Sequence, residues 1–287
     1  MAVAEFPLIR RVEAQFQGAS GRELFRRAWL PDDPFACALI VHGFAEHCGR
    51  YEHLATWLAS RGVAVHAFDH QGHGRSSGPR CFVRRFSDFL DDTERALTLA
   101  RTPHPDLPLF VIGHSMGGLV TASLAVERKP DVAGFVLSGA ALRPPVPLST
   151  GRRWLLALLR RLAPRLSFPS GLDPQALSTD PAVVRAYLDD PLVERRITTS
   201  LAVELFAAMG RTSARGAAVE RPLFALHGED DAICSPEGSH AFAAAARRGS
   251  YLGLPGMRHE IFNEPERERV YAAVLDWLTK IARGAQV

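Results

Sequence analysis

The 287-residue sequence has little cysteine, little net charge and no long hydrophobic run. Its four cysteines, at positions 37, 48, 81 and 234, form no C-x-x-C pair and no small disulfide framework, so we expect reduced thiols in the cytoplasm. The formal charge is only +3, from 34 basic and 31 acidic residues, and the arginines occur in separate pairs rather than in a long stripe. Nucleic acid is therefore not an expected partner.

Membrane-spanning and secretion signals are also missing. The best apolar run, at 154–159, is far too short to cross a bilayer. The N-terminal residues lack the apolar core of a secretion signal because Glu5 and Pro7 interrupt it. These absences predict a cytoplasmic protein, for which contact with a membrane surface stays open.

Apolar strands and amphipathic helices alternate along most of the chain. Two alternating segments near the N-terminus predict an antiparallel pair at a sheet edge. Later strands alternate with helices at short spacing, which predicts right-handed crossovers and a mostly parallel, eight-stranded sheet flanked by helices. The predicted strands are 12–16, 24–30, 36–41, 63–68, 109–112, 134–138, 223–226 and 251–254, and the helices between them are 51–60, 87–100, a stretch from 116, 236–247 and 266–282.

A segment of different character interrupts this alternation. Residues 143–218 begin with a proline-rich run at 144–147 and then show helical patterns at 154–162, 181–188 and 197–209, without a buried strand. We predict an α/β core in two parts, 1–142 and 219–287, with 143–218 as an inserted helical cap. The cap is interpreted as a lid whose apolar surface forms a pocket for an apolar substrate; a purely stabilising insertion is the alternative.

The sequence LFVIGHSMGGL at 109–119 contains G-x-S-x-G between a predicted strand and a predicted helix. Gly113 and Gly117 let the strand and the helix approach closely, so that Ser115 lies at the tip of a tight turn. The helix N-terminus below it favours negative charge. This context predicts that Ser115 is a nucleophile rather than an incidental turn residue.

A nucleophilic serine needs a histidine base and an orienting carboxylate, in the order serine, acid, histidine. His259 follows the last predicted strand directly, whereas its rival His240 falls inside a predicted helix. The acid should lie in the loop after the preceding strand, where the spacing favours Asp231 and leaves Asp230 open. His227, at the end of that strand, is interpreted as a hydrogen-bonded structural histidine.

Acyl transfer also needs donors for an oxyanion. The backbone N–H of Met116, directly after the nucleophile, is one candidate, and that of Phe44, in the loop after strand 36–41, is the other. No metal or organic cofactor is expected. His66, His70 and His73 lie around a glycine-rich turn, where their side chains more plausibly bind the loop backbone than a metal.

Four segments together resemble one protein family. They are HGFAEHCGRY at 42–51, FDHQGHGRS at 68–76, GHSMGG at 113–118, and residues 221–236 together with the pair His259 and Glu260. The combination is similar to the monoacylglycerol lipase and lysophospholipase branch of the α/β-hydrolases, from about residue 30 to the C-terminus.

The resemblance implies an α/β-hydrolase fold, a triad of Ser115, Asp231 and His259, and oxyanion donors at Phe44 and Met116. It also implies that Glu46 and Arg50 line the polar end of the site near glycerol, and that Cys234 lies near the site. Other members carry a small residue where this chain has Phe44, which bears on the width of the pocket.

We therefore expect a serine hydrolase that releases fatty acid and glycerol from monoacylglycerols through an acyl-enzyme intermediate. Its expected partner is the lipid ester substrate. Transient contact with a membrane surface would occur through the cap. The same chemistry on a lysophospholipid, another carboxylic ester or a thioester is the first alternative. Acyl transfer to an alcohol and a non-catalytic lipid- or partner-binding module are the others.

Overall fold

The computed structural model describes residues 8–144 and 149–284. Two predictions fall partly outside the described residues. The missing secretion signal was argued partly from residues 1–7, and the proline-rich run includes residues 145–147. The strands of the main sheet are β1 (Ile9–Gln17), β2 (Glu23–Pro31), β3 (Ala36–Val41), β4 (Val63–Phe68), β5 (Leu109–His114), β6 (Gly134–Ser138), β9 (Leu223–Gly228) and β10 (Gly249–Leu254).

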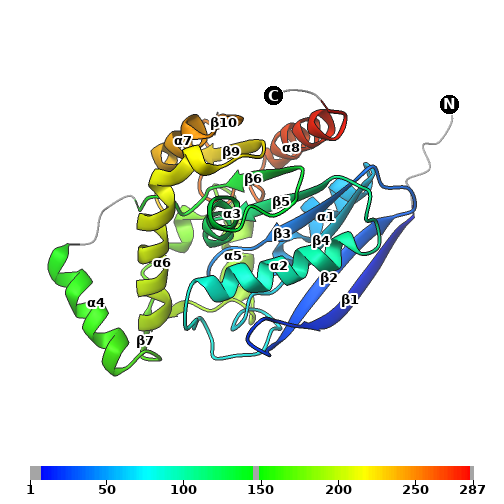
Figure 1. Ribbon diagram of the computed structural model, residues 1–287. Coiled ribbons are helices and arrows are strands. Elements are labelled where there is room, and N and C mark those ends of the chain that lie inside the picture. The colour runs from blue at the N-terminus through cyan, green and yellow to red at the C-terminus, as the bar shows by residue number, and fades with distance from the viewer. Residues whose placement is uncertain (1–7, 145–148, 285–287) are drawn as a thin grey trace.

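These eight strands form one sheet in the order β1-β2-β4-β3-β5-β6-β9-β10 (Figure 1). β2 runs antiparallel to both of its neighbours, and the remaining neighbouring pairs are parallel. The predicted eight-stranded, mostly parallel sheet is thus confirmed, as is the antiparallel pairing of the first two strands.

Helices cover both faces of the sheet, which explains why the inner strands are apolar without alternation. In β3, Leu39 belongs to one hydrophobic core and Ile40 to the other. The first core contains residues of α2 (Ser87–Arg101), α3 (Met116–Glu127) and α7 (Pro236–Ala245). The second contains residues of α1 (Glu52–Ala59) and α8 (Arg267–Ala282).

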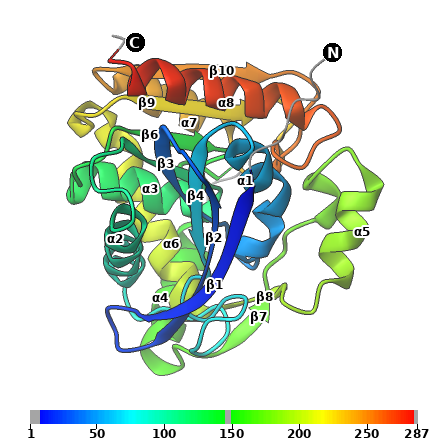
Figure 2. The same cartoon turned by 90° about the vertical axis from the view of Figure 1, so that its right-hand side faces the viewer.

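The insertion was predicted for the segment between β6 and β9, called the cap below. It contains α4 (Thr150–Leu162), β7 (Ser167–Pro169), α5 (Pro181–Asp189), β8 (Arg196–Thr198) and α6 (Thr199–Thr212). In Figure 1, α4 and α6 lie to the left of the main sheet, and Figure 2 shows α5 at the right of the view, apart from them. The domain limits at 142/143 and 218/219 stay a prediction.

The cap differs in one respect from the helical pattern. β7 and β8 pair as a small antiparallel ribbon, so the helix predicted from 197 begins only at Thr199. The β-branched Ile197 and Thr198 suit an extended strand. The Thr198 hydroxyl then accepts the N–H of Leu201 at 3.2 Å and caps α6.

Within the described ranges, no helix is both long enough and apolar enough to cross a membrane.

Candidate active site

Ser115 lies at the sharp turn between β5 and α3. Its φ of 53° and ψ of −117° are an unusual conformation for a residue with a side chain. Backbone hydrogen bonds maintain this conformation. The Ser115 N–H donates to the Ser138 carbonyl at 2.9 Å, and the Ser115 carbonyl accepts the N–H of Leu119 and of Ala141, each at 3.0 Å. The serine is therefore fixed at the C-terminal edge of the sheet.

The two glycines of the motif make this turn possible. A Cβ on Gly113 would lie 2.3 Å from the Gly117 carbonyl oxygen. A Cβ on Gly117 would lie 2.0 Å from the carbonyl oxygen of Val41 in β3. Both positions therefore require glycine for close helix–strand packing, as the motif predicts.

Asp231 and His259 meet in the loops after β9 and β10. The His259 Nδ1–H donates to Oδ2 of Asp231 at 2.7 Å. The other carboxylate oxygen, Oδ1, accepts the backbone N–H of Ile233 at 2.8 Å and of Cys234 at 2.9 Å. Because these three hydrogen bonds hold both carboxylate oxygens, the ring of His259 has a defined orientation and tautomer.

The electrostatics of this pair favour a histidine that can take a proton. Burial alone raises the pKa of Asp231, but the adjacent His259 and the hydrogen bond from His227 outweigh it and hold that pKa well below its usual range. Burial lowers the pKa of His259, but Asp231, followed by Glu260 and Glu46, outweighs burial and raises it above 6.5. The fixed negative charge therefore stabilises the imidazolium form.

The alternative acid, Asp230, and the alternative base, His240, both lie at the protein surface. Asp230 is exposed, and its backbone N–H donates to the carbonyl of Met257. His240 is exposed on α7, with its ring 4.8 Å from that of Tyr251. The structure thus brings Asp231, rather than Asp230, against His259.

The turn after β6 contacts both His259 and Ser115. A Cβ on Gly139 would be 3.4 Å from Nδ1 of His259, and the preceding Ser138 carbonyl accepts the Ser115 N–H. The ring of His114, next to the serine, lies 4.8 Å from the ring of His259. His259 and Ser115 therefore both pack against one short turn.

The loop after β3, with the candidate oxyanion donor Phe44, faces the serine. A Cβ on Gly43 would lie 3.2 Å from the Cβ of Ser115. This loop is fixed by His42, whose Nδ1 contacts the Gly43 carbonyl at 2.7 Å and whose Nε2 accepts the His70 N–H at 2.9 Å. The second candidate, Met116, is the first residue of α3, where the backbone N–H has no acceptor within the helix.

A cavity of about 490 Å³ opens at the serine. Ser115, Met116 and Phe44 line it from the core, beside Ile233 and Cys234. The cap supplies most of the rest, with apolar side chains that include Leu155, Leu156, Phe168, Ile197, Leu205, Phe206 and Met209. An apolar cavity with one polar end suits a substrate with an acyl chain.

Another cavity, of about 680 Å³, lies away from the serine. Five arginines contribute to its lining, and none of the predicted site residues does; they are Arg22, Arg84, Arg85, Arg160 and Arg165. In the part of the chain that the structure describes, no group of three or more His, Cys, Asp or Glu side chains is arranged to hold a metal ion.

Two features of the site were beyond sequence reasoning. The first is that His227 donates through Nε2 to Oδ2 of Asp231 at 2.9 Å, while its Nδ1 contacts the Ser239 hydroxyl at 2.8 Å. In the sequence, only the i, i+4 spacing of His227 and Asp231 indicates this hydrogen bond. The second is that Glu46 and Arg50 do not line the cavity at Ser115; instead, Arg50 contacts both Glu46 and Glu260. Their contact with glycerol stays a prediction.

Comparisons with known proteins identify the family to which this chain is similar. The family model described as serine aminopeptidase, S33, matches residues 32–266. The chain is 36% identical over 272 residues to a monoacylglycerol lipase of Mycolicibacterium smegmatis, covering 93% of this chain and 97% of the relative. It is 32% identical over 252 residues to phospholipase YtpA of Bacillus subtilis, covering 85% and 95% of the two chains.

A solved structure gives the same result. The crystal structure of Paleococcus ferrophilus monoacylglycerol lipase superposes with a TM-score of 0.82 at 32% identity, covering 90% of this chain and 99% of that chain.

Proposed function

The chain belongs to the serine aminopeptidase S33 family of α/β-hydrolases, and on that premise we propose that it hydrolyses monoacylglycerols to fatty acid and glycerol. The observation that carries the proposal is a strained serine that lines an apolar cavity, in a site that also contains a histidine hydrogen-bonded to a buried aspartate. The similarity to monoacylglycerol lipases over nearly the whole chain supports the substrate class.

In this proposal Ser115 attacks the ester carbonyl while Nε2 of His259 takes its proton. Asp231 orients the ring and stabilises the resulting imidazolium. The backbone N–H groups of Phe44 and Met116 donate to the tetrahedral oxyanion. The imidazolium then protonates the departing glycerol oxygen, and the acyl group remains bound to the serine.

The second half of the reaction uses the same groups. His259 takes a proton from a water molecule, the hydroxide attacks the acyl-enzyme, and the oxyanion again binds at the two N–H groups. Collapse of this intermediate returns the proton to Ser115 and releases the fatty acid. Every proton passes between the ester, water and side chains of this chain, so the proposed cycle uses no metal or organic cofactor.

A panel of esters tests the proposal. We expect purified protein to release fatty acid from monoacylglycerols of 8 to 18 carbons faster than from the lysophospholipids with matching acyl chains. The Ser115→Ala variant should fail on the entire panel. A wild-type protein that cleaves none of the glycerol esters would contradict the assigned substrate.

Lysophospholipid hydrolysis is the second candidate, supported by the 32% identity to a relative named as a phospholipase. The chemistry would be the same, with a charged leaving group in place of glycerol. A faster rate on lysophospholipids than on monoacylglycerols in the same panel would favour this candidate.

We also propose that α4 contacts a lipid surface. Trp154 and Leu162 are 74% and 72% exposed on this helix, and Leu158 is exposed between them. Leu155 and Leu156 of the same helix line the cavity at Ser115, so a lipid surface at α4 would be continuous with the substrate site. Such an exposed apolar face is typical of an interfacial helix.

Vesicle flotation tests this contact. Replacing Leu158 and Leu162 together by Glu should abolish flotation with phosphatidylcholine vesicles and leave cleavage of a water-soluble ester within twofold of wild type. Leu8→Glu, at an exposed leucine before β1, is the matched control and should float like wild type. Equal flotation of all three proteins would contradict a role for α4.

A further inference from the structure

A buried carboxylate holds the loop that carries Phe44. Oε1 of Glu46 accepts the backbone N–H of Gly43 at 2.6 Å and the Tyr51 hydroxyl at 2.7 Å. Its other oxygen, Oε2, accepts from Nη1 of Arg50 at 3.1 Å. The N–H of Gly43 directly precedes the candidate oxyanion donor, so the orientation of the Phe44 peptide depends on Glu46.

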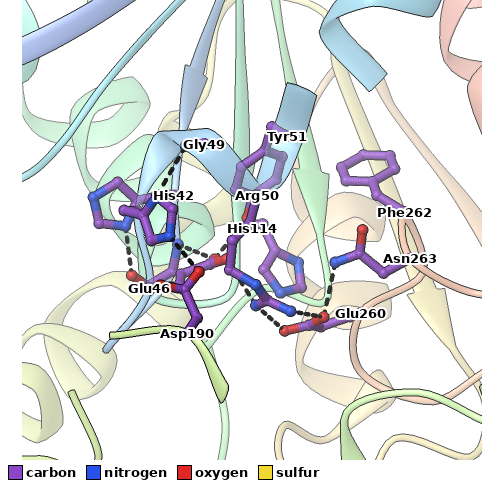
Figure 3. A network of polar contacts seen from close by, with 12 residues as sticks. His42, Glu46, Gly49, Arg50, Tyr51, His114, Asp190, Glu260, Phe262 and Asn263 are labelled. Carbon is purple, nitrogen blue, oxygen red and sulfur yellow. Dashed lines mark hydrogen bonds and ion pairs between the residues drawn. The ribbon is translucent and has the colours of Figure 1, made fainter. Parts of the chain in front are cut away.

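The same arginine reaches the loop that carries His259. Nη1 of Arg50 lies 2.5 Å from Oε1 of Glu260, and Nη2 lies 2.8 Å from Oε2. Asn263 also donates to Oε2 at 2.8 Å. Figure 3 shows Arg50 between Glu46 on one side and Glu260 on the other. A two-point contact of this kind fixes orientation as well as distance.

This cluster is largely buried. The side chains of Glu46 and Glu260 are each 4% exposed, and that of Arg50 is 10% exposed. The ring of Tyr187 in α5 covers the guanidinium, with its centroid 5.0 Å from Cζ. Burial of charges is costly unless they are paired, and here each carboxylate has at least two donors.

We propose that Glu46, Arg50 and Glu260 are positioning residues that fix the oxyanion loop relative to His259. The proposal rests on the proposed function, because it assigns how the same site is held in its reactive geometry. The three side chains connect residues 43–51 to 260–263 across the site, and none of them lines the cavity at Ser115. This positioning role differs from the predicted contact of Glu46 and Arg50 with the glycerol group, and the two make different predictions.

The expected effects follow from this geometry. Glu260→Gln keeps the shape of the side chain but removes the charge that pairs with Arg50. Glu46→Gln weakens the acceptor for the Gly43 N–H. Displacement of an oxyanion donor reduces turnover, by about 10²–10³-fold when one donor is lost completely. Either variant should therefore lower kcat by about tenfold or more while KM stays within about twofold.

Two esters with the same acyl chain separate positioning from glycerol contact. Monooctanoylglycerol contains the glycerol group, and p-nitrophenyl octanoate does not. A positioning role predicts the same fold-loss in kcat on both esters. A loss confined to monooctanoylglycerol, seen mainly as a higher KM, would overturn the proposal and assign Glu46 and Arg50 to glycerol binding.

Glu204 provides a matched control for stability. It is also a buried glutamate that accepts a backbone N–H, from Phe86 at 2.7 Å, and pairs with an arginine, Arg160. It lies on α6, outside the site. Glu204→Gln should lower the unfolding temperature as much as Glu46→Gln does, yet keep kcat within twofold. If Glu204→Gln lost as much kcat as Glu46→Gln, the effect at Glu46 would be explained by general destabilisation, and the proposal would be overturned.

A milder variant covers the case in which Glu46→Gln does not fold. Tyr51→Phe removes one of the donors to Glu46 and should lower kcat on both esters by a smaller, equal factor. Unchanged kcat in folded Tyr51→Phe and Glu260→Gln would contradict the proposal. If wild type cleaves only the nitrophenyl ester, the monoacylglycerol assignment fails while kcat on that ester still decides the positioning role.

Discussion

Nε2 of His227 lies 2.9 Å from Oδ2 of Asp231, the same oxygen that accepts from Nδ1 of His259. One carboxylate oxygen thus contacts two imidazoles, while the other accepts two backbone N–H groups. The aspartate has no freedom to rotate away from His259. We expect the turnover of this enzyme to depend on each contact that holds it.

Replacement of the aspartate tests its proposed role. Asp231→Asn should preserve folding and lower kcat by about 10³–10⁴-fold, because an amide cannot stabilise the imidazolium and can select the wrong tautomer. Asp230→Asn, at the exposed neighbour, should change kcat by less than twofold. Steady-state kinetics on p-nitrophenyl octanoate measure both, and a larger loss for Asp230→Asn would reassign the acid.

The second histidine gives a separate prediction. His227→Gln removes a buried donor to Asp231 and the contact to Ser239. We expect kcat to fall by about tenfold and the free energy of unfolding to fall by about 1–3 kcal/mol, since a buried charge loses a partner. Chemical denaturation followed by fluorescence measures the second quantity. Unchanged kcat would limit His227 to a structural role.

The raised pKa of His259 determines the acid limb of activity. Only the neutral imidazole can act as base, so kcat/KM should fall as the pH drops through a midpoint above 6.5. The charged form is stabilised mainly by Asp231, so Asp231→Asn should move that midpoint to lower pH. A pH-stat assay of fatty acid release measures both profiles. A midpoint that does not move would contradict the electrostatic coupling.

The same shifts affect folding stability with defined signs. The raised pKa of His259 contributes stability at low pH, which is lost as the pH rises through the folded-state pKa. The depressed pKa of Asp231 contributes stability above its unfolded value of about 3.8, lost as the pH falls further. Wild type should therefore lose more stability than Asp231→Asn on acidification below pH 3.8, as measured by thermal unfolding.

The glycine at the base of the serine turn tests the packing argument. Gly117→Ala places a methyl group 2.0 Å from the Val41 carbonyl oxygen, and neither backbone can move easily. We expect at least about 3 kcal/mol of destabilisation or no folded protein. Gly151→Ala in α4, where a Cβ meets nothing within 4 Å, is the control and should be neutral or stabilise by up to about 1 kcal/mol.

Much of the fold could be predicted because its signals are local. The continuous apolar runs identify strands that are buried on both faces, and the glycines around Ser115 identify the strand–helix turn. The chain order then brings Asp231 and His259 to one edge of the sheet, because parallel strands end on the same side. The choice between Asp231 and Asp230 was left open by spacing, since it depends on which side chain the loop turns inward.

The remaining features depend on packing between distant segments. Arg50 and Glu260 are 210 positions apart, and no periodicity links them. The ribbon of β7 and β8 pairs two three-residue segments that are too short to show alternation. Such contacts form only when two separate segments of the folded chain pack together, so the sequence pattern of either segment alone does not reveal them.

Peptide mapping after inactivation by a fluorophosphonate ester tests the central claim most directly. Our account predicts one phosphonyl group per protein, bound to Ser115, with ester hydrolysis lost in proportion to its incorporation. A fully active protein with Ser115 completely modified, or complete inactivation by modification of a different residue, would contradict it.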